Sequence, residues 1–317
     1  MSAAAGRDAP PALDAAGARR MARRVLKHLL GSAPKRLTPL GGGLTNFVFS
    51  ARHPEGLLTI RLNADPSKVK SYLKEQWAMA RAREQDVPVP EVLEVGTEPI
   101  PFPYMVSRQV PGMEGTLCTD RAEVLHALGR LARRIHGIPT RGFGHTFDWS
   151  ENLLSRNDSW ADWLEREFRG EQRLDVLARY GMLPKSALKA LRATLREIEG
   201  WSPDPVLNHG DLRLKNVIVD AEGRIAALLD WEFCTSNVAP AWDLSLALHD
   251  LSVDDKDALL AGYGLTPRET LEAMPAMRAF NVLNYAAVVE RAAEEKDQPT
   301  LERLRMRLHG GLDLYAF

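Results

Sequence analysis

The sequence predicts an α+β fold in which a small antiparallel sheet lobe precedes a larger, mostly helical lobe. In the first third of the chain, short apolar runs are separated by Gly and Pro, as expected for strands joined by turns. From residue 120 onward, long stretches carry apolar residues at helical spacing instead. One pair of short apolar runs, at residues 216–230, interrupts these helices and predicts a hairpin within the second lobe.

The first lobe begins with a predicted helix over residues 19–30, where RRMARRVLKHLL places its apolar residues near one face before Gly31. Strands follow in RLTPL, GGGLTNFVFSA and GLLTIRLN, with HPEG as the turn between the last two. Next come a helix over residues 67–85, a strand within DVPVPEVLEVG and a last strand in PFPYMVSRQV.

The second lobe is predicted from longer periodic segments. Helices are expected in RAEVLHALGRLARRIHGI, SWADWLEREFRGEQ and SALKALRATLREIEGW. The strands NVIVD and RIAALLD are joined by the turn AEG, and helices resume at Ala241 and continue to the C-terminus. We therefore expect three parts: a disordered tail rich in Ala, Pro and Gly over residues 1–18, a first lobe over 19–110 and a second lobe over 111–317.

Composition excludes several classes of protein. The chain is 45% hydrophobic and 26% charged with a net charge of −1, which is typical of a soluble globular protein and gives no overall attraction to nucleic acid or membrane. The two cysteines lie far apart, which argues against a disulfide scaffold or a zinc site and favours the reducing cytoplasm. We expect a cytoplasmic monomer or homodimer without nucleic-acid or membrane partners.

Polar residues that folding alone does not require stand in VLNHGDLRLKNVIVD, residues 206–220. Asp211 lies on a loop before the hairpin, Asn216 at the mouth of its first strand and Asp230 at the end of its second. Because a hairpin returns its far end to its start, we expect Asn216 and Asp230 to lie close together. A carboxylate and an amide oxygen suit Mg²⁺, and Asp211 could accept a proton from a hydroxyl.

These are the parts required for phosphoryl transfer, with Arg213 or Lys215 available to balance developing charge. The alternative is an ordinary loop, in which Asp211 caps a turn and Asn216 makes a local contact with the backbone. That alternative explains any one of these residues well, but it does not explain all of them at this spacing between apolar strands.

The segment HGDLRLKN…LLDWE resembles the aminoglycoside phosphotransferase and choline kinase family, whose fold is similar to that of protein kinases. The resemblance implies a bilobal protein-kinase-like fold, with a nucleotide-binding lobe over 19–110 and a catalytic and substrate-binding lobe over 111–317. It implies that Asp211 is the catalytic base, that Asn216 and Asp230 hold Mg²⁺, and that ATP or GTP is the co-substrate.

The same resemblance implies nucleotide-binding residues in the first lobe. In GGGLTNFVF, a glycine-rich loop covers the nucleotide, and in PYMVSRQV, backbone groups bind adenine. Arg61 stands where the family usually has Lys, which implies a phosphate contact; the alternative is that Arg61 is simply a cation on an edge strand. Glu75 either orients that cation or belongs to a solvated helix face. The implied nucleotide-binding residues are Gly42, Gly43, Thr45, Asn46, Arg61, Glu75, Ser107, Gln109 and Val110. IRLN, VPVPEVLEVG and GFG are also similar to the hygromycin-type branch.

Two residues outside these motifs match further features of the family. His136 fits a helix that ends in His, either as a packed helix-end residue or as part of the catalytic site. Asp243 precedes an apolar periodic run and is expected to be an N-cap that braces the catalytic loop.

The resemblance implies a kinase that transfers the γ-phosphate of ATP or GTP to a hydroxyl of an aminoglycoside-like, sugar or amino-alcohol acceptor. The alternative is a catalytically weak, kinase-like sensor or scaffold that binds nucleotide, which the Arg61 substitution favours. The acceptor stays open: carboxylates would bind a polycation, and tryptophans would either stack on a sugar or belong to the core. The candidates are Asp148, Glu151, Asp158, Asp162, Glu165, Trp149, Trp160 and Trp163.

Overall fold

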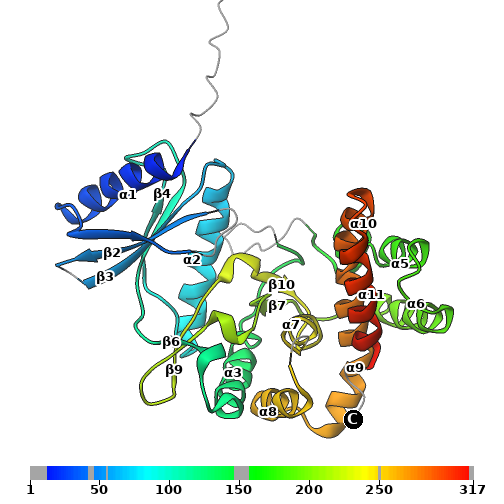
Figure 1. Cartoon of the computed structure of the whole chain (residues 1–317). Helices are drawn as coiled ribbons and strands as arrows, with labels where there is room; N and C mark the ends of the chain where they lie inside the picture. The colour runs from blue at the N-terminus through cyan, green and yellow to red at the C-terminus, as the bar shows by residue number, and fades with distance from the viewer. Residues whose placement is uncertain (1–12, 42–45, 55, 146–156, 249–250, 314–317) are drawn as a thin grey trace, which may run out of the picture. The chain divides into compact units, whose positions relative to one another are not determined.

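The structure is a computed structural model that describes residues 13–41, 46–54, 56–145, 157–248 and 251–313. The chain divides into two compact units (Figure 1). Unit 1 comprises Met1–Ala80 and Val89–Pro111, and unit 2 comprises Arg81–Pro88 and Gly112–Phe317. The α+β class predicted from the sequence is confirmed, because the first unit contains an antiparallel sheet accompanied by helices and the second unit is mostly helical.

Unit 1 contains a five-stranded antiparallel sheet with the strand order β1-β2-β3-β5-β4. Strand β3 therefore lies in the centre of the sheet, between β2 and β5. The strands are β1 (Arg36–Pro39), β2 (Phe47–His53), β3 (Gly56–Leu62), β4 (Val92–Gly96) and β5 (Tyr104–Arg108).

The core of unit 1 lies between this sheet and α1 (Ala15–Leu30). Leu58, Ile60 and Leu62 alternate along β3 and are fully buried in a cluster shared with apolar residues of α1. Burying each of these side chains contributes about 1.5–3 kcal/mol. Because side chains alternate across a strand, Arg61 points to the opposite face. There its partner comes from α2 (Lys68–Glu84).

Helix α1 begins four residues before the predicted start at residue 19. The side chain of Asp14 accepts a hydrogen bond from the backbone N–H of Gly17 at 2.6 Å and acts as the N-cap. At the other end, Gly31 adopts a left-handed conformation with φ of 72°, as predicted for a helix stop. Residues 15–18 are thus helical rather than part of the expected tail.

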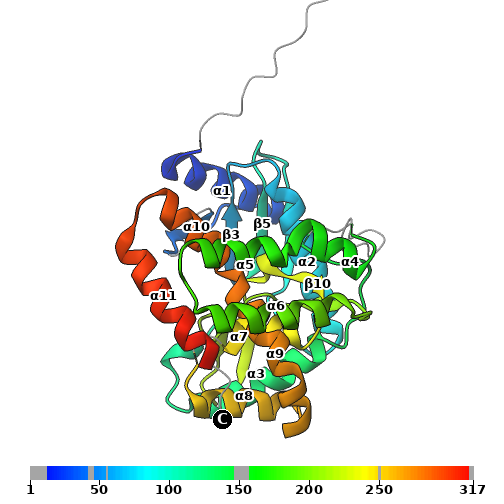
Figure 2. The same ribbon diagram turned by 90° about the vertical axis from the view of Figure 1, so that its right-hand side faces the viewer.

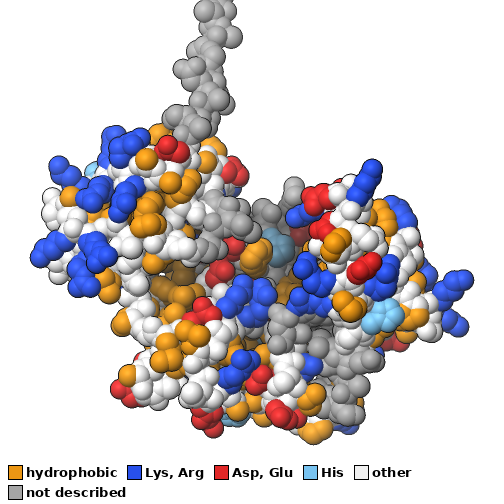
Figure 3. Space-filling model, viewed as in Figure 1, with side chains coloured by type: hydrophobic (Ala, Val, Ile, Leu, Met, Phe, Trp, Pro, Cys, Tyr) orange, Lys and Arg blue, Asp and Glu red, His pale blue; other side chains and the backbone are white. Residues whose placement is uncertain are grey.

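Basic side chains gather on the outward face of α1 and the adjoining strand ends (Figure 3). A net charge of −1 for the whole chain conceals this local concentration of positive charge. The exposed residues are Arg19, Arg20, Arg23, Arg24, Lys27, Lys35, Arg36 and Arg52.

Unit 2 is mostly helical, and Figure 2 shows α5 and α6 packed beside the C-terminal helices. Helix α3 packs along α8 through close backbone contact at Gly129 and Gly262. The helices are α3 (Arg121–Ile135), α4 (Trp160–Trp163), α5 (Gly170–Arg179), α6 (Lys185–Glu199), α7 (Ala241–Ala247), α8 (Val253–Tyr263), α9 (Pro267–Asn284), α10 (Ala286–Glu294) and α11 (Gln298–Asp313).

The hairpin predicted in unit 2 is present as β8 (Val217–Val219) and β9 (Ile225–Leu228). It is extended by β6 (Met113–Glu114), which pairs with β8. A second small sheet joins β7 (Val206–Asn208) to β10 (Thr235–Asn237). The prediction of one isolated hairpin was therefore incomplete, because these added pairings join segments distant in the sequence.

The single helix expected over residues 159–172 is broken. A π-helical turn over Leu164–Phe168 follows α4, and Arg169 adopts a left-handed conformation with φ of 53° before α5 begins. Trp160 and Trp163 stack with ring centroids 4.9 Å apart and are buried in an aromatic cluster. These two tryptophans belong to the core, so the interpretation that they stack on a sugar is wrong.

Two further features of the described chain bear on its environment. Cys118 is partly exposed, Cys234 is buried, and no disulfide joins them. In the ranges that the structure describes, no helix combines the length and the apolar character needed to cross a membrane.

Candidate active site

The loop and hairpin after β7 bring the predicted catalytic residues into one region of unit 2. Strands β8 and β9 pair with Val217 opposite Leu228. Beyond that pair, the backbone N–H of Leu229 donates to the carbonyl oxygen of Asn216 at 2.7 Å. The segment that starts β8 therefore lies beside the segment that carries Asp230, as the hairpin prediction required.

Asp211 is buried, and its carboxylate accepts hydrogen bonds from three side chains. Arg213 Nε donates to Oδ1, while Lys215 Nζ and Asn216 Nδ2 lie 3.0 and 2.8 Å from Oδ2. Burial raises the pKa of Asp211, but the hydrogen bonds and positive charges of Arg213 and Lys215 outweigh burial and leave the pKa below its ordinary value. Asp211 is consequently an ionised hydrogen-bond acceptor at neutral pH.

Lys215, one of the two cations that the sequence offered to balance developing charge, contacts Asp211 directly. The sequence contained a signal for it, because Lys215 follows Asp211 by four residues and both lie in the predicted loop.

The amide of Asn216 has a defined orientation. Its Nδ2 donates to both the backbone oxygen of Asp211 at 2.9 Å and the carboxylate oxygen Oδ2 at 2.8 Å. Since an amide nitrogen carries two hydrogens, this arrangement leaves Oδ1 as the atom available to a cation. Within the described ranges, no three His, Cys, Asp or Glu side chains form a metal site. A donor set of Asn216 and Asp230 fits Mg²⁺, which keeps water and phosphate oxygens as its other ligands.

Asp230 has an unusual backbone conformation, with φ of 63° and ψ of 60°. Non-glycine residues rarely adopt this left-handed conformation, and when they do it is often at a functional site. Immediately before it, the carbonyl oxygen of Leu229 lies 3.0 Å from Nε2 of His209. Burial lowers the pKa of His209 below 6.5, so a neutral imidazole donates from Nε2 to Leu229. His209 and Asn216 thus hold Leu229 from both sides and position Asp230.

Asp243 connects this loop to α7. Its fully buried carboxylate accepts the backbone N–H groups of His209 and Gly210 at 2.7 and 2.8 Å, and Nε2 of His136 lies 3.0 Å away. Burial raises the pKa of Asp243, but the bonds from His136 and His209 lower it more, so the carboxylate is ionised. The predicted bracing of the loop is present. The predicted N-cap role is wrong, because Pro240 occupies the N-cap and Asp243 lies in the first turn.

His136 extends this network from the C-cap of α3 to α8. Its Nδ1 lies 3.0 Å from the hydroxyl of Tyr263, whose pKa is raised to about 12 by burial. His136 is thus a buried helix-end residue that supports Asp243, and it reaches the loop only through that carboxylate.

Gly210 is required by a close approach in the same loop. Its φ is +82°, and a Cβ atom at this position would lie 2.2 Å from the carbonyl oxygen of Phe233. The segment after Asp230 therefore passes directly over the backbone before Asp211.

In unit 1, Arg61 forms an ion pair with Glu75, which is only 1% exposed. The guanidinium also lies over the ring of Tyr72, 5.1 Å from its centroid. Because β3 is a central strand, the alternative that Arg61 is an edge-strand cation is wrong, and so is the alternative that Glu75 belongs to a solvated face. Asn46 lies nearby: its Oδ1 accepts hydrogen bonds from Tyr72 and from Asn63, each at 2.8 Å.

The predicted adenine-binding segment follows β5. Ser107 lies within the sheet, and the N–H groups of Arg108 and Gln109 donate to Glu91 and Leu57 at 2.8 and 2.9 Å. The Gln109 side chain accepts from Ser50 at 2.6 Å. Several groups in this segment are therefore committed to the sheet before Val110 is reached. The predicted residues Gly42, Gly43 and Thr45 lie outside the described residues.

Of the carboxylates considered for a polycationic acceptor, the three that the structure describes do not form a common site. Asp158 and Glu165 are exposed, and Asp162 pairs with Arg166 at 3.0 Å. Asp148, Trp149 and Glu151 lie outside the described residues.

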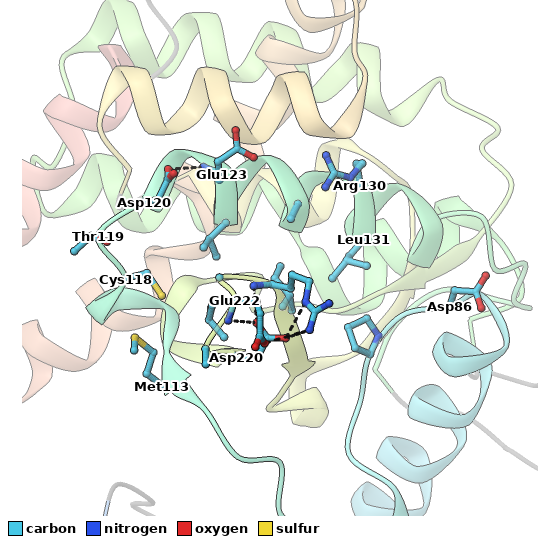
Figure 4. Close-up of a pocket in the computed structure, with 18 of the residues that line it drawn as sticks. Asp86, Met113, Cys118, Thr119, Asp120, Glu123, Arg130, Leu131, Asp220 and Glu222 are labelled. Atoms are coloured by element: carbon cyan, nitrogen blue, oxygen red, sulfur yellow. Dashed lines mark hydrogen bonds and ion pairs between the residues drawn. The ribbon is translucent and has the colours of Figure 1, made fainter.

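A cavity of about 850 Å³ in unit 2 lies between α3 and the β8–β9 hairpin (Figure 4). Its lining includes none of the predicted site residues. Several of its charged groups already have partners, since Arg224 pairs with both Asp220 and Glu222, and Asp120 accepts a backbone N–H at the start of α3. Size alone therefore does not make this cavity the active site.

Comparisons with known proteins agree with this description. A model of the phosphotransferase enzyme family matches residues 36–280, which is more than half of the chain. No curated relative matches the sequence. Solved structures of several phosphotransferases share the fold at low sequence identity.

A thermostable mutant of aminoglycoside phosphotransferase APH(4)-Ia, solved with AMP-PNP and hygromycin B, is 18% identical with a TM-score of 0.69 and covers 93% of this chain and 98% of its own. The GDP complex of aminoglycoside 2'-phosphotransferase-IIIa is 13% identical with a TM-score of 0.62, covering 92% and 97%. Macrolide 2'-phosphotransferase MphH from Brachybacterium faecium is 20% identical with a TM-score of 0.60, covering 90% and 96%.

Identities this low do not confirm the hygromycin-type branch, which stays a prediction. The protein-kinase-like fold expected from the sequence is confirmed. With the family model spanning both the sheet of unit 1 and the loop of Asp211, the chain belongs to the phosphotransferase enzyme family.

Proposed function

We propose that the protein transfers the γ-phosphate of ATP or GTP to a hydroxyl group of a small molecule. The observation that carries this proposal is that the loop before β8 and the end of β9 bring together an ionised Asp211, an oriented Asn216 amide and a positioned Asp230. The structural relatives solved with AMP-PNP and GDP support a purine nucleotide as co-substrate.

Asp211 would accept the proton of the acceptor hydroxyl as its oxygen attacks the γ-phosphorus. Arg213 and Lys215 contact the same carboxylate and would keep it ionised until the proton arrives. Asn216 and Asp230 would hold Mg²⁺, which when bound supplies charge neutralisation to the phosphate oxygens. Asp243 and His136 touch no reacting atom and act as positioning residues.

The residues of unit 1 would bind the nucleotide. The Arg61–Glu75 pair matches the place of the family's Lys–Glu pair, and a guanidinium contacts phosphate in a planar, forked geometry rather than as a point charge. Asn46, Ser107, Gln109 and Val110 are proposed to line the nucleotide, with Val110 as the backbone contact to adenine.

The test is nucleoside diphosphate formation with Mg²⁺ and ATP or GTP in the presence of a panel of hydroxyl acceptors. Asp211→Asn should lower kcat by about 10²- to 10⁴-fold without weakening nucleotide binding, because general-base catalysis contributes that much. Asp220→Asn is the matched control, since Asp220 lies in the hairpin turn and pairs with Arg224.

The sensor or scaffold alternative predicts a different result. In that case nucleotide still binds and raises the melting temperature. At 100 times its Kd, nucleotide adds about 2.7 kcal/mol to the free energy of unfolding. No acceptor in the panel, however, would yield diphosphate, and Asp211→Asn would change nothing.

A further inference from the structure

A second, smaller cavity of about 220 Å³ lies directly beside the loop of Asp211. We call it the α3–α7 cavity, because its walls come from the start of α3, the end of α7 and the loop between β7 and β8. Its apolar wall includes Leu125, Leu214 and Leu251, and its charged side chains are Arg121, Arg213 and Lys215. Among the described residues that line it there is no carboxylate.

The cavity is connected to the candidate base through two of its own lining residues. Arg213 donates to Oδ1 of Asp211, and Lys215 Nζ lies 3.0 Å from Oδ2. A ligand that occupied the cavity and contacted these cations would therefore lie within one side-chain length of the group proposed to accept the hydroxyl proton.

The three charged side chains can contact a ligand in the cavity without any rearrangement of the residues that line it. The side chains of Arg121, Arg213 and Lys215 are 43%, 41% and 46% exposed, so their ends meet solvent. Their carboxylate contacts include Asp255, 3.2 Å from Arg121, and Asp211 for the other two. The lining of the cavity, as far as the structure describes it, carries three cations and no carboxylate, and this positive charge attracts an anion and repels a polycation.

The size of the cavity limits the ligand. Pockets for drug-sized molecules measure roughly 300–1,000 Å³, so about 220 Å³ accommodates a small metabolite or one end of a larger molecule. The apolar wall would cover a short hydrocarbon segment, while the cations at the rim would bind an anionic end.

We propose that the phosphate acceptor is an anionic hydroxy compound, with a carboxylate or comparable anion joined to its hydroxyl by a short apolar segment. Arg121 and Lys215 bind the anion, the leucines cover the segment, and the hydroxyl meets Asp211. The hydroxyl oxygen bonds to the γ-phosphorus, the bond from that phosphorus to the β–γ bridging oxygen breaks, and the proton passes to Asp211. This inference rests on the proposed kinase function and specifies its substrate class.

Three six-carbon compounds that differ only in one end test the proposal: hydroxyhexanoate, hydroxyhexanamide and aminohexanol. With Mg²⁺ and ATP or GTP, hydroxyhexanoate should have a kcat/KM at least about tenfold above the neutral amide, since a charge-assisted hydrogen bond is lost in the amide. Aminohexanol should be the poorest acceptor. Hexanediol monophosphate, used in parallel, distinguishes a phosphate from a carboxylate as the preferred anion.

Arg121→Gln should raise KM for hydroxyhexanoate about tenfold and reduce its advantage over the amide, because the anion loses a cationic partner. Arg130→Gln is the control. It lies on the same helix, is exposed and lines the other cavity, so the preference should not change. Melting temperatures of both variants establish that they are folded.

The outcomes separate this inference from the kinase proposal. Turnover with equal or better use of the amide or aminohexanol overturns the anionic acceptor but leaves the kinase standing. If none of the acceptors is phosphorylated, calorimetric titration with the three compounds, in the presence of nucleoside diphosphate, tests whether the cavity binds the anion. Binding of hydroxyhexanoate that Arg121→Gln weakens supports the site, while its failure to bind wild type refutes it. Absence of any diphosphate formation counts against the kinase function.

Discussion

Removing the carboxylate of Asp243 should destabilise unit 2 and release the catalytic loop. In Asp243→Ala, two backbone N–H groups and the imidazole N–H of His136 lose their buried acceptor. Each unsatisfied buried donor costs about 1–3 kcal/mol. Even at the lower limit the sum is about 3 kcal/mol. In Asp243→Asn, the side chain keeps one oxygen as an acceptor, but its amide N–H groups face a backbone or imidazole N–H donor. We therefore expect the free energy of unfolding to fall by about 2 kcal/mol.

Thermal unfolding measures this effect. For a unit of about 200 residues, each 1 kcal/mol shifts Tm by roughly 2–4 °C, so Asp243→Ala should melt about 6–12 °C below wild type. The control is Asp175→Ala, because the Asp175 side chain is 67% exposed and its pair with Arg192 at 3.5 Å contributes little. An Asp243→Ala protein that melts within 2 °C of wild type would refute the role assigned to this carboxylate.

Turnover of the folded Asp243→Asn protein provides a second readout. If Asp243 positions the loop, kcat should fall by about 10²-fold, because a displacement near 1 Å of a reacting group costs that much. The KM for nucleotide, assigned to residues of unit 1, should stay near that of wild type. A loss of stability with unchanged kcat would mean that the carboxylate is structural only.

Three other substitutions test separate parts of the structure. Gly210→Ala should prevent folding of the loop, because the added Cβ meets the backbone of Phe233. Gly223 has a similar φ but open space around it, so Gly223→Ala should cost only about 1–2 kcal/mol. The difference between the two melting temperatures isolates the clash with Phe233. Because burial lowers the pKa of His209, stability should be full above pH 6.5 and decline as pH falls, and His209→Gln should flatten that decline in denaturant titrations from pH 7.5 to 5.5. Arg61→Gln should cost unit 1 about 3–5 kcal/mol by removing the cation paired with the buried Glu75 carboxylate, and Glu75→Gln in the same chain should restore part of it.

The parts of the site that could be predicted are those defined by short separations in the sequence. Asp211 and Asn216 are five residues apart on one loop, and Asn216 and Asp230 are joined by a hairpin whose turn and apolar strands are visible in the sequence. Local geometry alone brings these groups together, so the pattern of residues was sufficient.

The features that were missed or misassigned depend on contacts between distant segments. The pairing of β6 with β8 and of β7 with β10 leaves no periodic signal, because each strand has only two or three residues. The strand order placed Arg61 in the centre of the sheet, and no local pattern distinguishes a central strand from an edge strand. Likewise, the break at Arg169 follows from packing Trp163 and Phe168 into one aromatic cluster.

Asp243 shows that the presence of the motif residues and the orientation of their side chains are separate properties of the chain. The segment over residues 206–230 specifies which oxygens are present, but their orientation depends on a carboxylate 33 residues beyond Gly210 and on His136, 107 residues before Asp243. Both partners are buried: Asp243 contacts two backbone N–H groups and His136, and His136 also contacts the Tyr263 hydroxyl. A chain that kept HGDLRLKN but lost these two residues would still carry the recognisable motif. Its loop would lack the acceptor that fixes Asp211, so the presence of the motif alone is a weaker predictor of catalysis than the motif together with this buried pair.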